Sequence, residues 1–263
     1  MGRKIIIGVD LDRTLIYSRR FLEMHPITSG SKAILVEKTD KTESYISSDV
    51  VIALKKIKNR LKDKLEIVPV TSRSIEEYKR IQIPEIDFSY AITSAGGVIL
   101  HNNERNTDWE NQIDNLIDLD GMECLMEQLN GMESTDYKSK VIDGVYVFSK
   151  CNNIHTAKEE LISIRERNKG FDIQMDKHKI YATNKGVNKG TALVWLSDRL
   201  GTNCIMAFGD SMMDMPMLQA ADKSFTPTHN TIGEQIVEAN HINVVSGGTD
   251  SIISVLKFIE GAV

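Results

Sequence analysis

Short, continuous apolar runs alternate with stretches of helical spacing along most of this chain. The continuous runs are rich in isoleucine and valine and predict strands buried on both faces, at 4–9, 65–70, 90–93 and 204–208. The stretches with apolar residues at helical spacing predict helices at 49–62, 74–81, 188–200, 212–220 and 248–260. Strands that alternate with helices predict an α/β fold with a doubly wound, Rossmann-like parallel sheet.

The pattern changes in the middle of the chain. It predicts a long helix from 109 to 129, a strand at 141–148, a helix at 156–168 and two short strands at 171–175 and 178–182. Glycines border this block at 96–97 and at 186, as suits hinges. We therefore predict a core made of residues 1–97 and 185–263, with residues 98–184 inserted as an α+β cap domain. A hairpin is predicted near 33–47.

Composition excludes some partners. The chain has 263 residues, a formal net charge of -5 and 26% charged residues, which is ordinary for a protein in water. The basic stretch 55–62 alternates with apolar positions like a solvated helix face, so we expect no nucleic-acid partner. We expect no secretory leader and no membrane span. Cys124, Cys151 and Cys204 are scattered, which fits reduced thiols in a cytoplasmic protein.

Two acidic residues follow the first apolar run. Asp10 and Asp12 lie at the end of the predicted strand 4–9, where open α/β sheets keep their active sites. Residues i and i+2 of an extended chain face the same side, so both carboxylates can face one ligand. A hard cation such as Mg²⁺ would relieve their repulsion and leave one carboxylate as nucleophile and the other as proton carrier.

Polar residues also follow the ends of other predicted strands. Thr71-Ser72-Arg73 follows the strand at 65–70, and Gly209-Asp210 follows the strand at 204–208. Asp214 lies one helical turn after Asp210, and Lys189 opens the helix predicted at 188–200. The carboxyl end of the sheet therefore offers four carboxylates, a hydroxyl group and an ammonium group.

This order of motifs strongly resembles the haloacid dehalogenase superfamily of phosphohydrolases. The four motifs that match are Asp10-Leu11-Asp12-Arg13-Thr14, Thr71, Lys189, and Gly209-Asp210 with Asp214. Ser94-Ala95-Gly96-Gly97 and the segment 209–218 are similar to members with a large type-2 cap, the Cof-type and sucrose-phosphate-phosphatase-like branch. The insert matches in layout only.

The resemblance implies a phosphatase with an aspartyl-phosphate intermediate on a small phosphorylated metabolite, first of all a sugar phosphate. Asp10 would be the nucleophile and Asp12 the proton carrier. The implied catalytic residues are Asp10, Asp12, Thr71 and Lys189. The implied substrate-binding residues are Thr71, Ser72, Arg73 and Lys189. The implied ligands of one Mg²⁺ are Asp10, Asp12 through its backbone carbonyl, Asp210 and Asp214.

Simpler interpretations remain open for several residues. Thr71 can be a helix cap, a role for which Ser74 competes. Arg13 stands where most relatives carry glycine, and it can reach substrate or lie over the surface. Lys150, Arg165 and Lys177 are basic candidates for contact with a leaving group, or ordinary surface charges.

Rival functions also stay open. A phosphotransferase or phosphomutase would use the same motifs with a sugar hydroxyl in place of water. A non-catalytic ligand-binding protein can keep this fold, although the intact set of acids argues against it. The sequence leaves the oligomeric state open.

Overall fold

The computed structural model describes residues 4–28 and 30–262. Its centre is a five-stranded sheet in which every neighbouring pair is parallel. The strand order is β15-β14-β13-β1-β5, and the strands are β1 (Ile5–Val9), β5 (Leu65–Pro69), β13 (Cys204–Phe208), β14 (Lys223–Pro227) and β15 (Asn243–Val245). The predicted α/β fold with a doubly wound parallel sheet is therefore confirmed.

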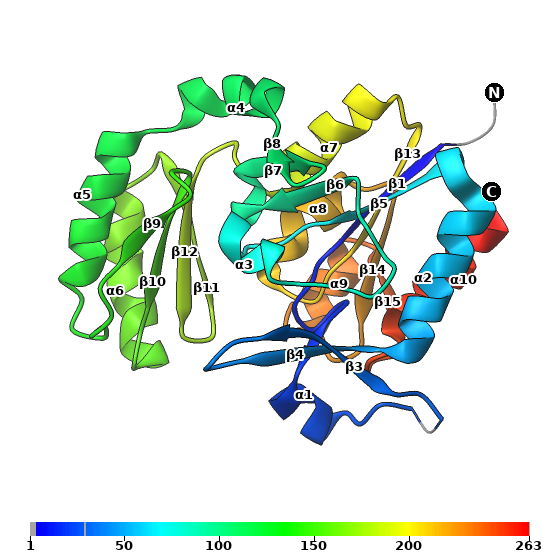
Figure 1. Cartoon of the computed structure of the whole chain (residues 1–263). Helices are drawn as coiled ribbons and strands as arrows, with labels where there is room; N and C mark the ends of the chain where they lie inside the picture. Colours follow the sequence, from blue (N-terminus) through cyan, green and yellow to red (C-terminus); the bar gives the residue numbers. More distant parts are fainter. Residues whose placement is uncertain (1–3, 29, 263) are drawn as a thin grey trace.

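Helices cover both faces of this sheet. Helix α2 (Ser48–Leu61) packs beside α10 (Ser251–Ala262) on one face, and α7 (Lys189–Leu200) packs beside α8 (Met215–Ala220) on the other (Figure 1). All five residues of β1 are buried, because a strand covered on both sides has no polar face. The ends of the central strands are therefore the places where polar side chains reach solvent.

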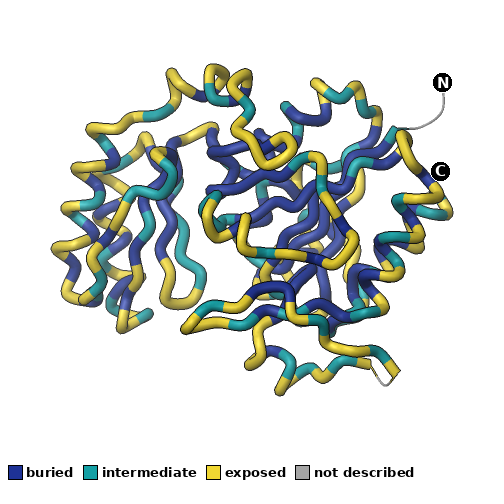
Figure 2. Tube along the Cα trace, in the orientation of Figure 1, coloured by how far each residue is buried: buried dark blue, intermediate teal, exposed yellow. Residues whose placement is uncertain are grey.

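A second sheet lies apart from the first and is antiparallel. Its order is β11-β12-β10-β9, and two helices pack against it, α5 (Leu119–Asn130) and α6 (Ile154–Arg167). The strands are β9 (Lys140–Ile142), β10 (Tyr146–Lys150), β11 (Phe171–Asp176) and β12 (Lys179–Asn184). Buried residues from Met122 to Ala182 form a separate apolar cluster between this sheet and its helices. The buried stretches of these elements are dark blue on the left of Figure 2.

Two element predictions in this region are wrong. The helix predicted from 109 to 129 is two helices, α4 (Thr107–Ile113) and α5, because Asp118 caps the second one by accepting a hydrogen bond from Gly121 N at 2.9 Å. The strand predicted at 141–148 is divided into β9 and β10 by a turn at Asp143-Gly144, where both residues have positive φ. Asp-Gly is a common hairpin turn.

Two smaller sheets flank the main one. The first has the order β2-β4-β3 and contains the predicted hairpin at 33–47; the second has the order β6-β7-β8. Their strands are β2 (Tyr17–Ser18), β3 (Ala33–Lys38), β4 (Glu43–Ser47), β6 (Tyr90–Thr93), β7 (Val98–His101) and β8 (Glu104–Arg105). The remaining helices are α1 (Arg19–Met24), α3 (Ile75–Lys79) and α9 (Glu234–Ala239).

Apolar packing crosses the predicted domain border. Val98, Leu100 and Trp109 lie in the cluster of the main sheet, and Trp109 Nε1 donates a hydrogen bond to Gly96 O at 3.2 Å. The separate cluster begins only at Met122. The division into a core and a cap at 98–184 stays a prediction. Within the described ranges, no helix is long and apolar enough to cross a bilayer.

Candidate active site

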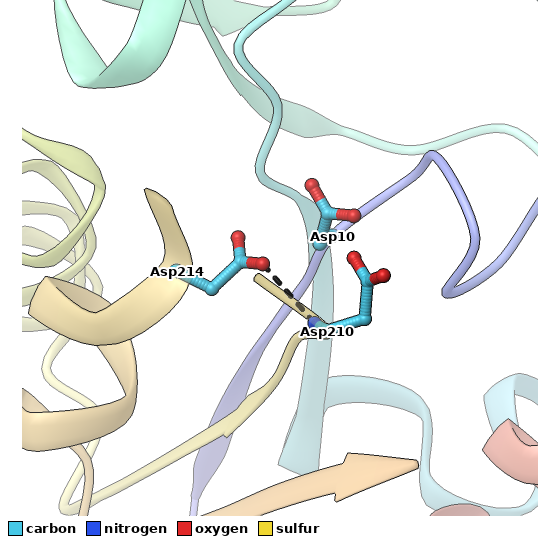
Figure 3. Close-up of side chains that lie close together, drawn as sticks. All are labelled: Asp10, Asp210 and Asp214. Atoms are coloured by element: carbon cyan, nitrogen blue, oxygen red, sulfur yellow. Dashed lines mark hydrogen bonds between the residues drawn. The ribbon is translucent and has the colours of Figure 1, made fainter. Parts of the chain in front are cut away.

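Three aspartates meet at the carboxyl end of the parallel sheet. Asp10 directly follows β1, Asp210 follows β13 after one glycine, and Asp214 lies at the start of α8. One carboxylate oxygen from each lies within 4.8 Å of the others, and all three residues are buried. Figure 3 shows their side chains converging on one space. The sheet topology thus joins residues 200 positions apart into one acidic cluster.

Lys189 supplies a positive charge to this cluster. Its Nζ donates to Asp10 Oδ1 at 2.7 Å and to Asp214 Oδ1 at 2.6 Å, and its side chain is only 2% exposed. Burial lowers the pKa of Lys189, but the two carboxylates outweigh burial and leave its pKa above the ordinary value. Asn188 caps α7 in front of it. The helix start fixes the backbone, and the paired carboxylates fix the ammonium group.

Asp214 uses both of its oxygens. Oδ1 accepts from Lys189, and Oδ2 accepts from the backbone N–H groups of Asp210 and Ser211 and from the Ser211 hydroxyl, at 2.9 to 3.1 Å. Figure 3 marks the bond to Asp210 N. A Cβ atom at Gly209 would lie 2.5 Å from Asp214 Cβ, so glycine is needed for this approach. Asp214 therefore holds the loop 209–214 in shape.

Burial and repulsion perturb the other two acids. Burial, followed by the charge of Asp214, raises the pKa of Asp10 to about 7. Burial, followed by the charges of Asp10 and Asp214, raises the pKa of Asp210 to about 8. Lys189 and Arg13, whose Nη1 lies 3.3 Å from Asp210 Oδ2, supply two positive charges to three clustered carboxylates, so the ionised cluster retains unbalanced negative charge.

This charge and the open oxygens fit a divalent metal ion. Asp210 Oδ2 is buried without a hydrogen-bond partner among the described residues, and Asp10 accepts a described hydrogen bond only at Oδ1. Hard cations such as Mg²⁺ take carboxylate oxygens of this kind. Asp10 and Asp210 offer the available oxygens, whereas those of Asp214 are engaged. The acidic cluster is present, and the identity of the ion stays a prediction.

Arg13 reaches the cluster from the loop after β1. Its φ is 68°, a left-handed conformation that glycine adopts without strain. Arg13 Nη1 lies 3.3 Å from Asp210 Oδ2, and Nη2 donates to His229 O at 2.8 Å. His229 Nδ1 accepts from Gly248 N, so Nε2 donates to Arg13 O at 2.8 Å. Arg13 is thus tied to the acidic cluster and to the loop after β14.

Asp12 does not join the acidic cluster. Its side chain is 54% exposed, and Arg73 Nε and Nη2 donate to its two oxygens at 2.7 and 2.8 Å. Partial loss of solvent raises the pKa of Asp12, but the hydrogen bonds and charge of Arg73 outweigh this and leave the pKa below its ordinary value. Its predicted roles as proton carrier and backbone ligand stay predictions.

Thr71 is buried and is not a helix cap. Ser74 caps α3 with a reciprocal bond to Glu77, and the Thr71 hydroxyl accepts from Arg73 N at 3.2 Å. The cleft beside the acidic cluster is lined by Ser72, whereas Thr71 is absent from its described lining. Arg73 donates three of its five side-chain N–H groups to Asp12 and Glu37. The phosphate-binding roles of all three residues stay predictions.

A cleft of about 360 Å³ opens above the cluster. Asp10, Asp12, Arg13 and Lys189 lie on its core side, and the β11–β12 turn, residues 176–179, lies on the other side. Of the three basic candidates, Lys177 lines the cleft, and Lys150 and Arg165 are absent from its described lining. A larger groove of about 1190 Å³ lies between β3 and residues 78–88, and Leu11 is also part of its lining.

Several residues around the cleft belong to none of the sequence motifs. His178 and Lys179 lie beside Lys177, and Tyr146 OH donates to Ser72 O at 2.8 Å. The turn between two predicted strands was a signal for the first two residues, since hairpin tips often carry function. Nothing in the sequence indicates that Glu37 contacts Arg73.

Comparison with known proteins agrees with this geometry. Residues 122–231 match a family model described as haloacid dehalogenase-like hydrolase. The family resemblance is confirmed. The match includes Lys189, Asp210 and Asp214 of the acidic cluster. Magnesium dependence and a cytoplasmic location stay predictions.

Similar proteins include several phosphatases. The HMP-PP phosphatase of Citrobacter koseri is 43% identical over 63 residues, a stretch that spans 23% of this chain and 22% of that protein. The sucrose-phosphatase of Synechocystis, solved with sucrose and phosphate, has a TM-score of 0.67 at 13% identity, and 99% of each chain is covered. A sugar phosphatase of HAD subclass IIB has a TM-score of 0.66 at 14% identity, covering 98% of this chain and 99% of that one. These structures show a shared fold.

Proposed function

We propose that the protein is a Mg²⁺-dependent phosphohydrolase that cleaves a small phosphorylated metabolite through an aspartyl-phosphate on Asp10. The observation that carries this proposal is the buried Lys189 ammonium held between Asp10 and Asp214, beside Asp210 and under the cleft. Burying a lysine among three acids costs more desolvation free energy than burying an apolar side chain of the same size. Packing alone therefore does not explain its presence. Such perturbed groups gather at functional sites.

Asp10 is the proposed nucleophile. Lys189 holds its Oδ1, and its Oδ2 accepts no hydrogen bond from a described residue. In the first step one carboxylate oxygen of Asp10 forms a bond to phosphorus while the bond from phosphorus to the leaving oxygen breaks. Lys189 balances the charge of Asp10 and of the incoming phosphoryl group. The lysine is in place before substrate binds, so little reorganisation is needed.

Asp12 is the proposed proton carrier. It lines the cleft beside Asp10. The negative charge of a bound phosphate ester would oppose the effect of Arg73 and raise the pKa of Asp12, and the protonated carboxyl group can then give its proton to the leaving oxygen. The resulting carboxylate then takes a proton from the water that attacks the aspartyl-phosphate. That step releases inorganic phosphate and restores Asp10.

Asp10 and Asp210, supported by Asp214, would hold the Mg²⁺. The bound ion would supply charge compensation between the anionic nucleophile and the anionic phosphate. Lys189 and Arg13 keep the acids ordered on the core side.

A sugar phosphate is the proposed substrate class. The names of two structural relatives, a sucrose-phosphatase and a sugar phosphatase, support it, as does a cleft of small-molecule size. The β11–β12 turn faces the place where the leaving group would lie. We propose that residues 98–184 act as a cap whose turn selects this group and limits water.

Phosphate release tests the proposal. Sugar phosphates, nucleotides and diphosphates are incubated with and without Mg²⁺, with the Asp10→Asn variant beside the wild type. Release that needs both Mg²⁺ and Asp10 supports the proposal. Substrate loss without equivalent free phosphate supports phosphoryl transfer, and no turnover of any compound favours a binding role.

A further inference from the structure

A buried carboxylate outside the acidic cluster points to an additional positioning residue. Glu37 lies in β3, and its side chain is only 1% exposed. It accepts from the Ser44 hydroxyl at 2.9 Å, from Arg73 Nη1 at 2.8 Å and from Arg80 Nε at 3.3 Å. A buried glutamate with three donors occupies one fixed orientation, since rotation would leave charges unpaired.

The backbone of β3 turns Glu37 inward. The pairing register between β3 and β4 shifts between Leu35 and Glu37, so Val36 is an extra residue in the strand. Counted as whole residues, Leu35 is 45% exposed, whereas Val36 and Glu37 are each 4% exposed. A bulge of this kind redirects the side chain that follows it, and bulges are common beside active sites.

Arg73 connects Glu37 to Asp12. It donates through Nη1 to Glu37 and through Nε and Nη2 to the two oxygens of Asp12. The guanidinium is planar, so the bond on the Glu37 side fixes the direction of the fork on the Asp12 side. No other hydrogen bond from the described residues reaches the Asp12 carboxylate, which is 54% exposed. The orientation of Asp12 therefore depends on Arg73.

We propose that Glu37 acts through Arg73 to hold the Asp12 carboxylate in its orientation at the cleft. The inference rests on the proposed function, because it assumes that Asp12 delivers a proton to the leaving oxygen. A misplaced proton carrier slows this transfer without removing the nucleophile or the Lys189 charge. Glu37 is then a positioning residue in a segment that none of the four motifs contains.

Leaving groups of different basicity provide a selective test. An alkoxide leaving group needs a proton as the bond to phosphorus breaks, whereas p-nitrophenolate leaves with little assistance. The kcat/KM values of wild type, Glu37→Gln and Glu43→Gln are measured with glucose 6-phosphate and with p-nitrophenyl phosphate in Mg²⁺. Glu43 is the matched control, because it lies in the same small sheet but pairs with Arg19, Lys38 and Tyr45.

The Glu37→Gln variant is expected to lose about tenfold in kcat/KM on glucose 6-phosphate and less than about threefold on p-nitrophenyl phosphate. Glu43→Gln is expected to change neither. An equal loss on both substrates, or no loss, overturns the proposal. If Glu37→Gln does not fold, Arg73→Lys keeps the charge but loses the fork, and the same unequal loss is expected.

A crystal structure of Glu37→Gln tests, independently of turnover, whether Glu37 orients Asp12 through Arg73. Loss of at least one Arg73 bond to Asp12, or a second conformer of Asp12, supports the proposal. An unchanged fork overturns it even if wild-type activity is absent on both probes. Failure of the proposed function itself is distinguished by the wild type and Asp10→Asn releasing phosphate equally.

Discussion

The parallel core and the β11–β12 turn use charge in opposite ways. In the core, the side chains of Asp10, Lys189 and Asp214 are at most 9% exposed and fix one another's positions. In the turn, Lys177, His178 and Lys179 are exposed, and Asp176 lies beside them in the cleft. Breaking a buried ion pair lowers the free energy of unfolding strongly, whereas an exposed charge contributes little to it. We therefore propose that the core carries out the reaction and that the turn sets substrate preference.

The largest expected effect is at the nucleophile. Asp10→Asn removes the attacking oxygen's charge while keeping its shape, and we expect kcat to fall by about 10⁴-fold or more. Circular dichroism and thermal unfolding of the variant check that the fold is retained. Turnover close to that of wild type would falsify the proposed mechanism.

Removal of the buried cation tests the core side of the comparison. Lys189→Met leaves Asp10 and Asp214 without their common partner, and we expect a loss of about 3 to 5 kcal/mol in the free energy of unfolding. A fall in kcat of about 10² to 10³-fold is also expected. Denaturant unfolding and steady-state kinetics measure the two effects. Lys185→Met, an exposed lysine just before α7, is the control and should leave both values near wild type.

Stability of the metal-free protein is expected to fall as pH rises from about 4 to about 8. The unfolded carboxyl groups titrate near pH 3.9, whereas Asp10 and Asp210 have pKa values of about 7 and about 8 in the folded state. Between these limits the folded state binds more protons, so each pH increase favours unfolding.

Added Mg²⁺ is expected to weaken this dependence of stability on pH. The ion binds the ionised acids, so it should raise the melting temperature more at pH 8 than at pH 6. Thermal unfolding in chelator and in Mg²⁺ at both pH values gives the comparison. A Mg²⁺ effect that is larger at pH 6 contradicts the assignment of Asp10 and Asp210 as the ion's ligands.

Arg13→Gly tests whether the extra cation of the core competes with metal. The change removes the positive charge 3.3 Å from Asp210 Oδ2, and glycine accepts the positive φ of this position. We expect Mg²⁺ to bind about three- to tenfold more tightly, as isothermal titration calorimetry measures. An unchanged or weaker affinity means that Arg13 does not oppose the ion.

The smallest effects belong to the turn. Lys177→Ala and Lys179→Ala should raise KM by about two- to tenfold and leave the melting temperature within about 1 °C of wild type, because exposed charges contribute little to folding. Kinetics with sugar phosphates of different size measure the change. A large loss of kcat with unchanged KM would mean that the turn residues take part in the chemical step, which contradicts the proposed division between core and turn.

The sequence predicted the core better than the surrounding parts. Asp10, Asp210 and Lys189 could be placed because strand ends and helix starts follow from local patterns, and parallel topology brings them together. The break at Asp118 was missed because helical spacing continued across it, and the turn at Asp143-Gly144 was missed although its residues favour one. The contact of Glu37 with Arg73 joins residues 36 positions apart through a bulge, for which no local pattern exists.

The hydrogen bonds of Asp214 have a thermodynamic consequence. Backbone donors and the Ser211 hydroxyl hold this side chain and the loop from Asp210 to Asp214 without an ion. Association with a cation then needs little chain ordering, and the release of water from the ion and the carboxylates dominates its entropy. We therefore expect binding at this loop to be driven by entropy, with only a small change in heat capacity.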